Sequence, residues 1–448
     1  MTCDRWRVSF LLVLLAAGPA SVQPVGAAPP TAAVERYRAE LRKHVKHIVV
    51  IIQENRSFDN FFKDFPGADS ADTGMSHSGP VALHPVDLDF PADVDHQHRA
   101  FVQEYDGGRM DGWDVAMTSP RQAPTFPYAY VPRAQIEPYW TMASRWTLAD
   151  KMFQSNTGPS FPAHLYLIAG ESDLTASNPN HLETTHFAWG CDSPPNATVT
   201  RIDALGVEVP GPFPCLDFPT IADRAEAAGV SWRYYAPPLD SLGSIWSAFD
   251  AIKHIRYGPL WQNVISPETR VLDDARHGDL PAITWVVPTA ANSDHPFPHH
   301  ATAGDIASTG QYGPDWVASV VNAVGEGPLW NSTAIFVVWD DWGGWYDHVT
   351  PPELDRMGLA FRVPFIVISP YARRGYVSHV RHEFGSVLKF TERAFDLPSL
   401  NTTDTRSDAL RDCFDFSQAP EAFAPIPSLH RAAFFERPGA LDEIPDND

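Results

Sequence analysis

The chain has 448 residues, of which 44% are hydrophobic, so it can bury a large core and is not globally disordered. Its formal net charge of −22 disfavours nucleic acid as a general partner, because nucleic-acid binding depends on a basic surface. The 42 prolines and 14 tryptophans indicate a loop-rich globular protein and disfavour a helical bundle or a repeat array.

The first thirty residues have the pattern of an export signal. Two arginines precede an apolar run at 8–17, and the small residues at 25–27 resemble a cleavage site. The run is shorter than the ~20 residues needed to span a bilayer, and no later stretch is apolar enough to do so. We therefore expect a signal peptide at 1–27, a lead-in at 28–44, and a secreted, extracytoplasmic protein without an integral membrane segment in the mature chain.

Short runs rich in Val, Ile and aromatic residues predict strands that are buried on both faces, as in a parallel sheet. These runs occupy residues 47–52, 230–235, 283–287, 334–339 and 365–368. Apolar residues at helical spacing predict helices over 220–228, 316–324 and 384–395. The alternation of strands and helices predicts an α/β fold with a doubly wound, mostly parallel sheet flanked by helices.

Two long segments, 68–134 and 172–214, are rich in Pro, Gly and Asn and have weak periodicity. They predict long, loop-rich insertions over one edge of the sheet, where loops tend to carry function. The sequence has no internal repeat and no clear linker, so we expect one main domain over 45–400. An irregular tail over 401–448 is expected to follow it.

Three cysteines remain once the signal peptide is removed, and export permits a disulfide between two of them. Cys191 and Cys215 bracket a local loop and are expected to pair, which would leave Cys413 without a partner. The chain has no Cys-x-x-Cys motif, so a zinc ribbon or a redox motif is not expected.

Polar residues follow directly after three of the predicted strands. Glu54-Asn55 follows the first strand and Asp340-Asp341 another, and Asp294-His295 lies in the loop after a third. Ligands of open α/β sheets bind beyond the carboxyl ends of the strands, so these side chains are expected at one rim. One acidic strand end often caps a helix or faces solvent, but two favour a site for a hard divalent cation, and histidine also admits zinc or iron.

Ser160 is a candidate nucleophile. It precedes the apolar run 165–169 and is expected at the start of a helix, where free N–H groups favour phosphate and a developing alkoxide. A serine needs a base or a metal to activate it, and the segment alone also fits an ordinary helix cap.

Five segments together form a recognisable pattern. They are Glu54-Asn55-Arg56-Ser57-Phe58-Asp59-Asn60, Gly107-Gly108-Arg109-Met110-Asp111-Gly112-Trp113, Gly158-Pro159-Ser160-x-Pro162, Asp294-His295-Pro296 and Asp340-Asp341-x-Gly343-Gly344-x-Tyr346-Asp347-His348-Val349. In this order they resemble the secreted phosphoesterase family that contains bacterial and plant non-specific phospholipases C and AcpA-type acid phosphatases. The resemblance covers 45–397 and implies an alkaline-phosphatase-like core, with 45–400 as a phosphoesterase catalytic domain.

The resemblance implies a hydrolase that acts on phosphoric ester bonds with one divalent metal ion as cofactor. The ion would be bound by Glu54, Asn55, Asp340 and Asp341 together with the hydroxyl of Ser160, which would form a phosphoryl-enzyme. The physical chemistry agrees, because three carboxylates packed together repel one another unless a positive charge is present.

The resemblance also implies that His96 and His295 contact the phosphoryl oxygens or protonate the leaving alcohol, whereas it assigns no role to His348. Two departures from the family pattern leave the substrate open. Ser160-x-Pro162-Ala163-His164 replaces Thr-x-Pro-Asn-Arg, and Asp340-Asp341-Trp342-Gly343-Gly344 replaces Asp-Glu-His-Gly-Gly. We expect a phosphate-ester substrate, with a phosphomonoester (acid phosphatase) and a phospholipid (phospholipase C) both open.

Three other classes of protein fit the sequence less well. A sulfatase-like ester hydrolase would share Ser160-x-Pro162, but the Arg expected two residues later is His164. A serine esterase would have Gly-x-Ser-x-Gly, which this segment lacks. A non-catalytic secreted binding module would not need acidic strand ends gathered beside a serine.

Overall fold

The computed structural model describes residues 31–90, 92–116, 122–180, 188–296 and 312–437. The expected signal peptide at 1–27 and the last part of the expected tail lie outside these residues. None of the helices within the described ranges is both long and apolar enough to cross a membrane.

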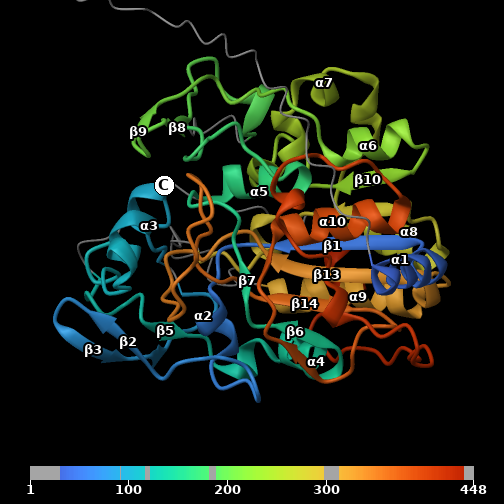
Figure 1. Cartoon of the computed structure of the whole chain (residues 1–448), viewed down its shortest axis with the longest axis horizontal. Helices are drawn as coiled ribbons and strands as arrows, with labels where there is room; N and C mark the ends of the chain where they lie inside the picture. Colours follow the sequence, from blue (N-terminus) through green and yellow to red (C-terminus); the bar gives the residue numbers. More distant parts are fainter. Residues whose placement is uncertain (1–30, 91, 117–121, 181–187, 297–311, 438–448) are drawn as a thin grey trace, which may run out of the picture.

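An eight-stranded sheet forms the centre of the protein (Figure 1), with the strand order β11-β10-β12-β1-β13-β14-β6-β15. Its strands are β1 (His47–Gln53), β6 (Thr147–Ala149), β10 (Trp232–Tyr235), β11 (Val264–Ile265), β12 (Ile283–Val286), β13 (Thr333–Trp339), β14 (Phe365–Ile368) and β15 (Tyr376–Ser378). Neighbouring strands from β11 to β13 are parallel, and so are β6 and β15, whereas β14 is antiparallel to both of its neighbours.

Two groups of helices, each connected by contacts among its members, flank this sheet. The first consists of α1 (Ala32–His44), α5 (Ser160–Ala169), α6 (Ile221–Ala227) and α10 (Phe384–Phe395), and the second of α4 (Glu137–Arg145), α8 (Arg270–His277), α9 (Gly313–Glu326) and α11 (Ala432–Phe435). Figure 1 shows α5 and α10 on one side of the central strands and α4 and α9 on the other. Because both faces are covered, the central strands β1, β12, β13 and β14 are buried and mainly apolar. The predicted α/β class with a mostly parallel sheet flanked by helices is confirmed.

The remaining elements are short. They are α2 (Phe58–Phe62), β2 (Thr73–Ser76), β3 (Gly79–Ala82), β4 (His84–Pro85), α3 (His98–Tyr105), β5 (Ala129–Tyr130), β7 (Met152–Phe153), β8 (Thr200–Ile202), β9 (Glu208–Pro210), α7 (Lys253–Arg256) and β16 (His382–Glu383). The expected lead-in contains α1, which packs on α10, and the chain after residue 401 has few regular elements. In the structure Cys191 is joined to Cys215 by a disulfide, and Cys413 is buried with a free thiol.

The register between β1 and β13 determines where the functional loops begin. The two strands pair in parallel from His47 opposite Thr333 to Gln53 opposite Trp339. The next residues along the chain, Glu54 and Asp340, therefore leave the sheet side by side at the same edge, the carboxyl edge where ligands of α/β sheets bind.

Candidate active site

The two acidic strand ends are held together by backbone hydrogen bonds. The backbone N–H of Asp340 donates to the carbonyl of Gln53 at 3.0 Å, and that of Asn55 donates to Asp340 Oδ1 at 3.1 Å. Asn55 has a left-handed backbone with φ of 57°, a conformation that asparagine tolerates better than most residues. This turn directs Asn55 back toward the loop after β13.

A glycine permits the close approach of that loop. Gly343 also has a positive φ of 62°, and a Cβ atom placed on it would lie 2.2 Å from the backbone oxygen of Asn55. A side chain at this position would therefore force the loop after β13 away from β1. The Gly-Gly of the last motif is thus required by the packing of the site.

The side chains of Glu54, Asn55, Asp340 and Asp341 are completely buried, and they face one another. The amide oxygen of Asn55 is 3.1 Å from Glu54 Oε2 and 3.2 Å from Asp340 Oδ1. Its amide nitrogen faces the other way, toward the ring nitrogens of two histidines. Rotating the amide by half a turn would let it donate to both carboxylates. In that orientation its oxygen would face both histidines, so a cation is indicated by the gathered buried carboxylates and not by the direction of the amide.

Ser160 is the first residue of α5 and completes this group of oxygen atoms. Its Oγ lies 3.2 Å from Asp341 Oδ2 and 3.3 Å from the amide oxygen of Asn55. The serine is completely buried, and the residue before the helix is Pro159, which cannot cap it with a side-chain hydrogen bond. We call Glu54, Asn55, Ser160, Asp340 and Asp341 the oxygen-donor site.

His164 is a member of the site that the sequence analysis noted only as a departure from the family pattern. Its Nε2 lies 2.8 Å from Glu54 Oε1 and 3.7 Å from Asp340 Oδ2, the carboxylate oxygens that point away from Asn55. The ring is buried, and its Nδ1 has no hydrogen-bond partner. The spacing of four residues from Ser160, which places both on one face of a helix, is the signal that could have found it.

The electrostatics of the site favour a divalent cation. Burial raises the pKa of Asp340 well above its usual range, and the charge of Glu54 raises it further. Burial together with Asp340 raises the pKa of Asp341 to about 7. Asp340 Oδ2 is also a buried atom without a hydrogen-bond partner. Buried carboxylates in this position need either protons or a cation, and five oxygen donors fit a hard divalent ion.

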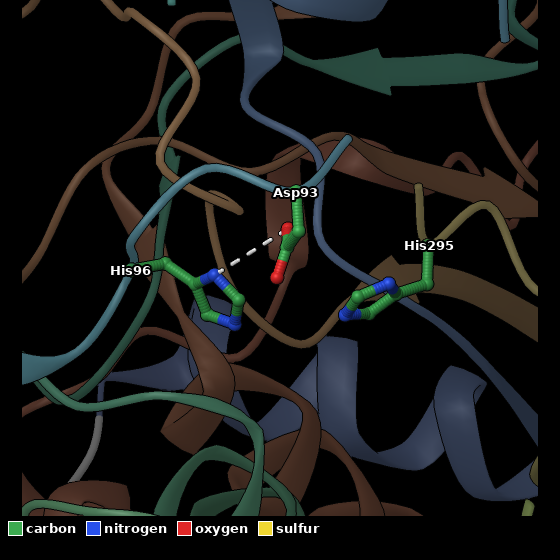
Figure 2. A group of neighbouring side chains, drawn as sticks. All are labelled: Asp93, His96 and His295. Atoms are coloured by element: carbon green, nitrogen blue, oxygen red, sulfur yellow. Dashed lines mark ion pairs between the residues drawn. The ribbon is translucent and has the colours of Figure 1, made fainter. Parts of the chain in front are cut away.

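His96 and His295 lie beside the oxygen-donor site, because both rings face Asn55. Figure 2 shows the two rings next to each other. Nδ1 of His96 donates to the carbonyl of Val94 at 2.7 Å, and Nδ1 of His295 donates to that of Pro296 at 2.9 Å. These bonds leave each Nε2 facing the Asn55 amide nitrogen, at 2.9 Å for His96 and 3.0 Å for His295. Two imidazoles thus present their second nitrogen toward the same point.

Asp93 lies close to the rings of both histidines, as Figure 2 shows. Its Oδ1 is 3.9 Å from His96 Nδ1, as the dashed line in Figure 2 marks, and Asp93, His96 and His295 together could also hold a cation. The structure therefore brings all of the predicted catalytic and metal-binding residues into one buried region.

The second halves of the first and last motifs form a different cluster behind the site. Arg362 is completely buried, and its guanidinium donates to Asp347 at 2.8 Å and to Asp59 at 3.1 Å. His348 lies 2.6 Å from Asp59 through Nδ1. We call Asp59, Asp347, His348 and Arg362 the arginine cluster. His348 is therefore a hydrogen-bond partner of Asp59 in this cluster, a role that the sequence did not indicate.

The Gly-Gly-Arg-Met-Asp-Gly-Trp motif is also away from the oxygen donors. Trp113 packs in a small second core with Trp342, Tyr346 and Phe361, and the indole N–H of Trp342 donates to the buried Glu104 at 2.7 Å. The motif therefore supports the loop after β13 through aromatic packing.

Comparisons with known proteins agree with this geometry. Residues 45–398 match the sequence model of the Phosphoesterase family. Phospholipase C A of Mycobacterium tuberculosis is 26% identical, in an alignment covering 85% of this chain and 79% of that protein. Hemolytic phospholipase C of Pseudomonas aeruginosa is 25% identical over 84% of this chain and 56% of its own. Non-specific phospholipase C6 of Arabidopsis thaliana is 22% identical over 85% and 74%.

Solved structures give more distant matches. A protein in the alkaline phosphatase superfamily from Vibrio parahaemolyticus has a TM-score of 0.37 and 9% identity, over 83% of this chain and 78% of that one. The phosphonate monoester hydrolase of Agrobacterium radiobacter has a TM-score of 0.38 and 10% identity, over 85% and 79%.

Proposed function

The chain belongs to the Phosphoesterase family, and from this premise we propose that it is a secreted, metal-dependent phosphoester hydrolase that works through a phosphoserine at Ser160. The observation that carries the proposal is the position of the Ser160 hydroxyl, 3.2 Å from Asp341 Oδ2 and 3.3 Å from the Asn55 amide oxygen among buried carboxylates. A binding module would have no use for a hydroxyl in that place.

The oxygen-donor site would hold one divalent ion through Glu54, Asn55, Ser160, Asp340 and Asp341. When bound, such an ion supplies positive charge beside the phosphoryl oxygens and stabilises the serine alkoxide. His164 would hold the outer oxygen of Glu54 by a hydrogen bond, so that the inner oxygen stays turned toward Asn55, and it lies 3.7 Å from the outer oxygen of Asp340. Hydrogen-bonded carboxylates of this kind are the usual support of a metal site.

In the first step Ser160 Oγ attacks phosphorus and its proton passes to Asp341 Oδ2. The bond from phosphorus to the leaving oxygen breaks, and His96 or His295, in its imidazolium form, gives that oxygen the proton of Nε2 and becomes neutral. In the second step the same histidine takes a proton from a water that attacks the phosphoserine. The bond from phosphorus to Oγ then breaks, and Ser160 regains its proton from Asp341.

The substrate class follows from two lines of support. The relatives named as phospholipases C favour a phospholipid headgroup ester. The serine nucleophile and the Asp340-Asp341 pair, where family phospholipases commonly have Thr and Asp-Glu, favour a phosphomonoester and so an acid phosphatase. A sulfate ester is disfavoured because His164 stands where sulfatases carry an arginine.

The test is an assay of the mature protein on an aryl phosphate, on phosphatidylcholine and on an aryl sulfate. We expect hydrolysis of at least one phosphate ester and none of the sulfate. Ser160→Ala should lower kcat by at least about 10³-fold, ~4 kcal/mol of barrier, while the circular dichroism spectrum is unchanged. Acid quenching during turnover should trap one phosphoryl group on the peptide that contains Ser160. An active Ser160→Ala variant would contradict the mechanism.

Secretion is tested separately, by fractionating cells that express the full chain. The protein should be found outside the cytoplasm, with its N-terminus near residue 28. Retention of the intact N-terminus in the cytoplasm would contradict this part of the proposal.

A further inference from the structure

A second group of metal-ligating side chains lies outside the oxygen-donor site. His382 is in β16, and Asp412 and Cys413 are in a short 3₁₀ helix, Arg411–Cys413, of the chain after residue 401. Neither segment supplies a side chain to the oxygen-donor site. His382 and Cys413 are buried, whereas the side chain of Asp412 is 23% exposed, so an ion could reach the group from solvent.

The three side chains point at one another with nearly equal spacing. His382 Nε2 is 3.7 Å from Asp412 Oδ1 and 3.9 Å from Cys413 Sγ, and Sγ is 3.8 Å from Oδ1. Around a tetrahedral zinc ion, nitrogen, oxygen and sulfur ligands at their usual bond lengths are about 3.3–3.6 Å apart. The observed triangle would need to contract by only a few tenths of an ångström to place one ion at its centre.

The orientation of the histidine fits metal binding. Nδ1 of His382 lies 2.7 Å from Asp408 Oδ1, which also accepts a hydrogen bond from Ser386 Oγ at 2.7 Å. The proton is therefore held on Nδ1, and the lone pair of Nε2 faces Asp412 and Cys413. A carboxylate behind a ligating histidine is the usual second layer of a zinc site.

The charge of the group also fits a cation. Burial raises the pKa of the Cys413 thiol well above its usual range, and the neighbouring Asp412 and Asp408 raise it further. A divalent ion binds the sulfur as thiolate, and its charge would offset the two neighbouring carboxylates. Ser378 Oγ lies 3.0 Å from His382 Nε2 and donates to Asp412 Oδ2. The fourth ligand of a tetrahedral ion would therefore be this hydroxyl or a water.

We propose that His382, Asp412 and Cys413 bind a zinc-like transition-metal ion at a second site, which ties the chain after residue 401 to β16. Nitrogen, oxygen and thiolate ligands select zinc or a similar ion over calcium or magnesium. On binding, the bond from sulfur to the metal forms as the thiol proton passes to solvent. This site does not depend on the hydrolytic function proposed above.

The experiment uses Co²⁺ as a spectroscopic probe on the purified full chain. To separate the two sites, it is done on the wild type and on Asp340→Asn, in which the oxygen-donor site is weakened. We expect both proteins to show a near-ultraviolet charge-transfer band from thiolate to cobalt. Cys413→Ser should lose the band while it keeps the wild-type circular dichroism spectrum and the wild-type rate on an aryl phosphate.

Zinc content gives a second readout that does not depend on the serine variant. Asp340→Asn should retain about one equivalent of zinc after gel filtration, and the added change His382→Gln should lower this at least tenfold. A cobalt-loaded wild type without the thiolate band would overturn the proposal, as would a band that survives Cys413→Ser. Either result would mean that the three groups are joined by hydrogen bonds alone.

Discussion

The oxygen-donor site and the arginine cluster are built from the same two sequence motifs and yet are neutralised differently. The first halves of the motifs supply Glu54-Asn55 and Asp340-Asp341, and the second halves supply Asp59 and Asp347. Asp59 and Asp347 are paired with the buried guanidinium of Arg362, whereas no lysine or arginine forms a described ion pair with the carboxylates around Asn55.

The difference shows how a structural carboxylate can be told from a metal ligand. The carboxylates of the arginine cluster accept hydrogen bonds from Arg362, and their charges raise the pKa of that guanidinium above its usual value. Asp340 instead has a buried oxygen without a donor. Buried carboxylates gathered around a hydroxyl, with no lysine or arginine among their described contacts, therefore fit a cation-binding role, even when their motif continues directly into a pair compensated by arginine.

The largest expected effect concerns the arginine cluster. Arg362→Met leaves Asp59 and Asp347 buried without their partner and should lower the free energy of unfolding by about 3–5 kcal/mol. Denaturant titration of the metal-free protein measures this. A triple variant with Asp59→Asn and Asp347→Asn added should recover much of the loss, because no uncompensated charge remains. Equal stability of wild type and Arg362→Met would show that the ion pairs do not hold the motifs together.

The next effect separates the two regions with a matched pair of substitutions. Asp340→Asn should weaken divalent-ion binding at least about 100-fold, ~2.7 kcal/mol, and lower kcat with it, since it removes a charge from the oxygen-donor site. Asp347→Asn makes the same chemical change in the arginine cluster and should leave the metal affinity within about twofold. Isothermal titration calorimetry measures both. Similar losses of affinity in the two variants would contradict the distinction drawn between the regions.

A smaller effect is expected at His164, which contacts the outer carboxylate oxygens. His164→Ala should weaken metal binding about tenfold, ~1.4 kcal/mol, because Glu54 loses the partner that orients it. His164→Gln can still donate a hydrogen bond to Glu54 and should recover part of this loss. If the alanine variant binds the ion as tightly as the wild type, His164 does not position the site.

The smallest effect concerns a buried pair of acidic side chains, Glu392 and Asp404, that lies away from both regions. Burial and the neighbouring Asp404 raise the pKa of Glu392 to about 8, from an ordinary value of 4.5. The folded protein therefore binds the proton more tightly than the unfolded chain, and stability from this group is lost as pH rises from about 4.5 to 8. Between pH 4.5 and 8, the melting temperature of the wild type should therefore fall by about 2 °C more than that of Glu392→Gln. If the melting temperature of Glu392→Gln falls with pH as steeply as that of the wild type, Glu392 is not the source of this pH dependence.

Much of the fold could be predicted because the central strands are fully buried. Continuous apolar runs identify β1, β12 and β13, and the 384–395 pattern coincides with α10. Three strands of the sheet carry no such signal: β6 and β15 have three residues each and β11 has two, too few for a period to show. Nor does the sequence indicate that β14 runs antiparallel to β13, since an apolar run is the same in either direction.

The site was predictable to the extent that it follows strand ends. Glu54-Asn55 and Asp340-Asp341 meet because parallel strands end at one edge, which sequence reasoning can anticipate. The role of Arg362 as an ion-pair partner could not be predicted from the sequence. It is one of 33 Lys and Arg residues, and its partner Asp59 lies 303 positions away along the chain. His164 was visible as a departure from a motif, but only its 2.8 Å distance to Glu54 gives it a role.

The most direct test of the cation at the oxygen-donor site is metal removal and return in Cys413→Ser, which lacks the second proposed site. Hydrolysis of an aryl phosphate should fall below about a hundredth of the starting rate after exhaustive chelation. It should return in proportion to added divalent ion and saturate at one equivalent bound, measured by elemental analysis. Full activity in protein shown to hold less than about a tenth of an equivalent of metal would contradict the account.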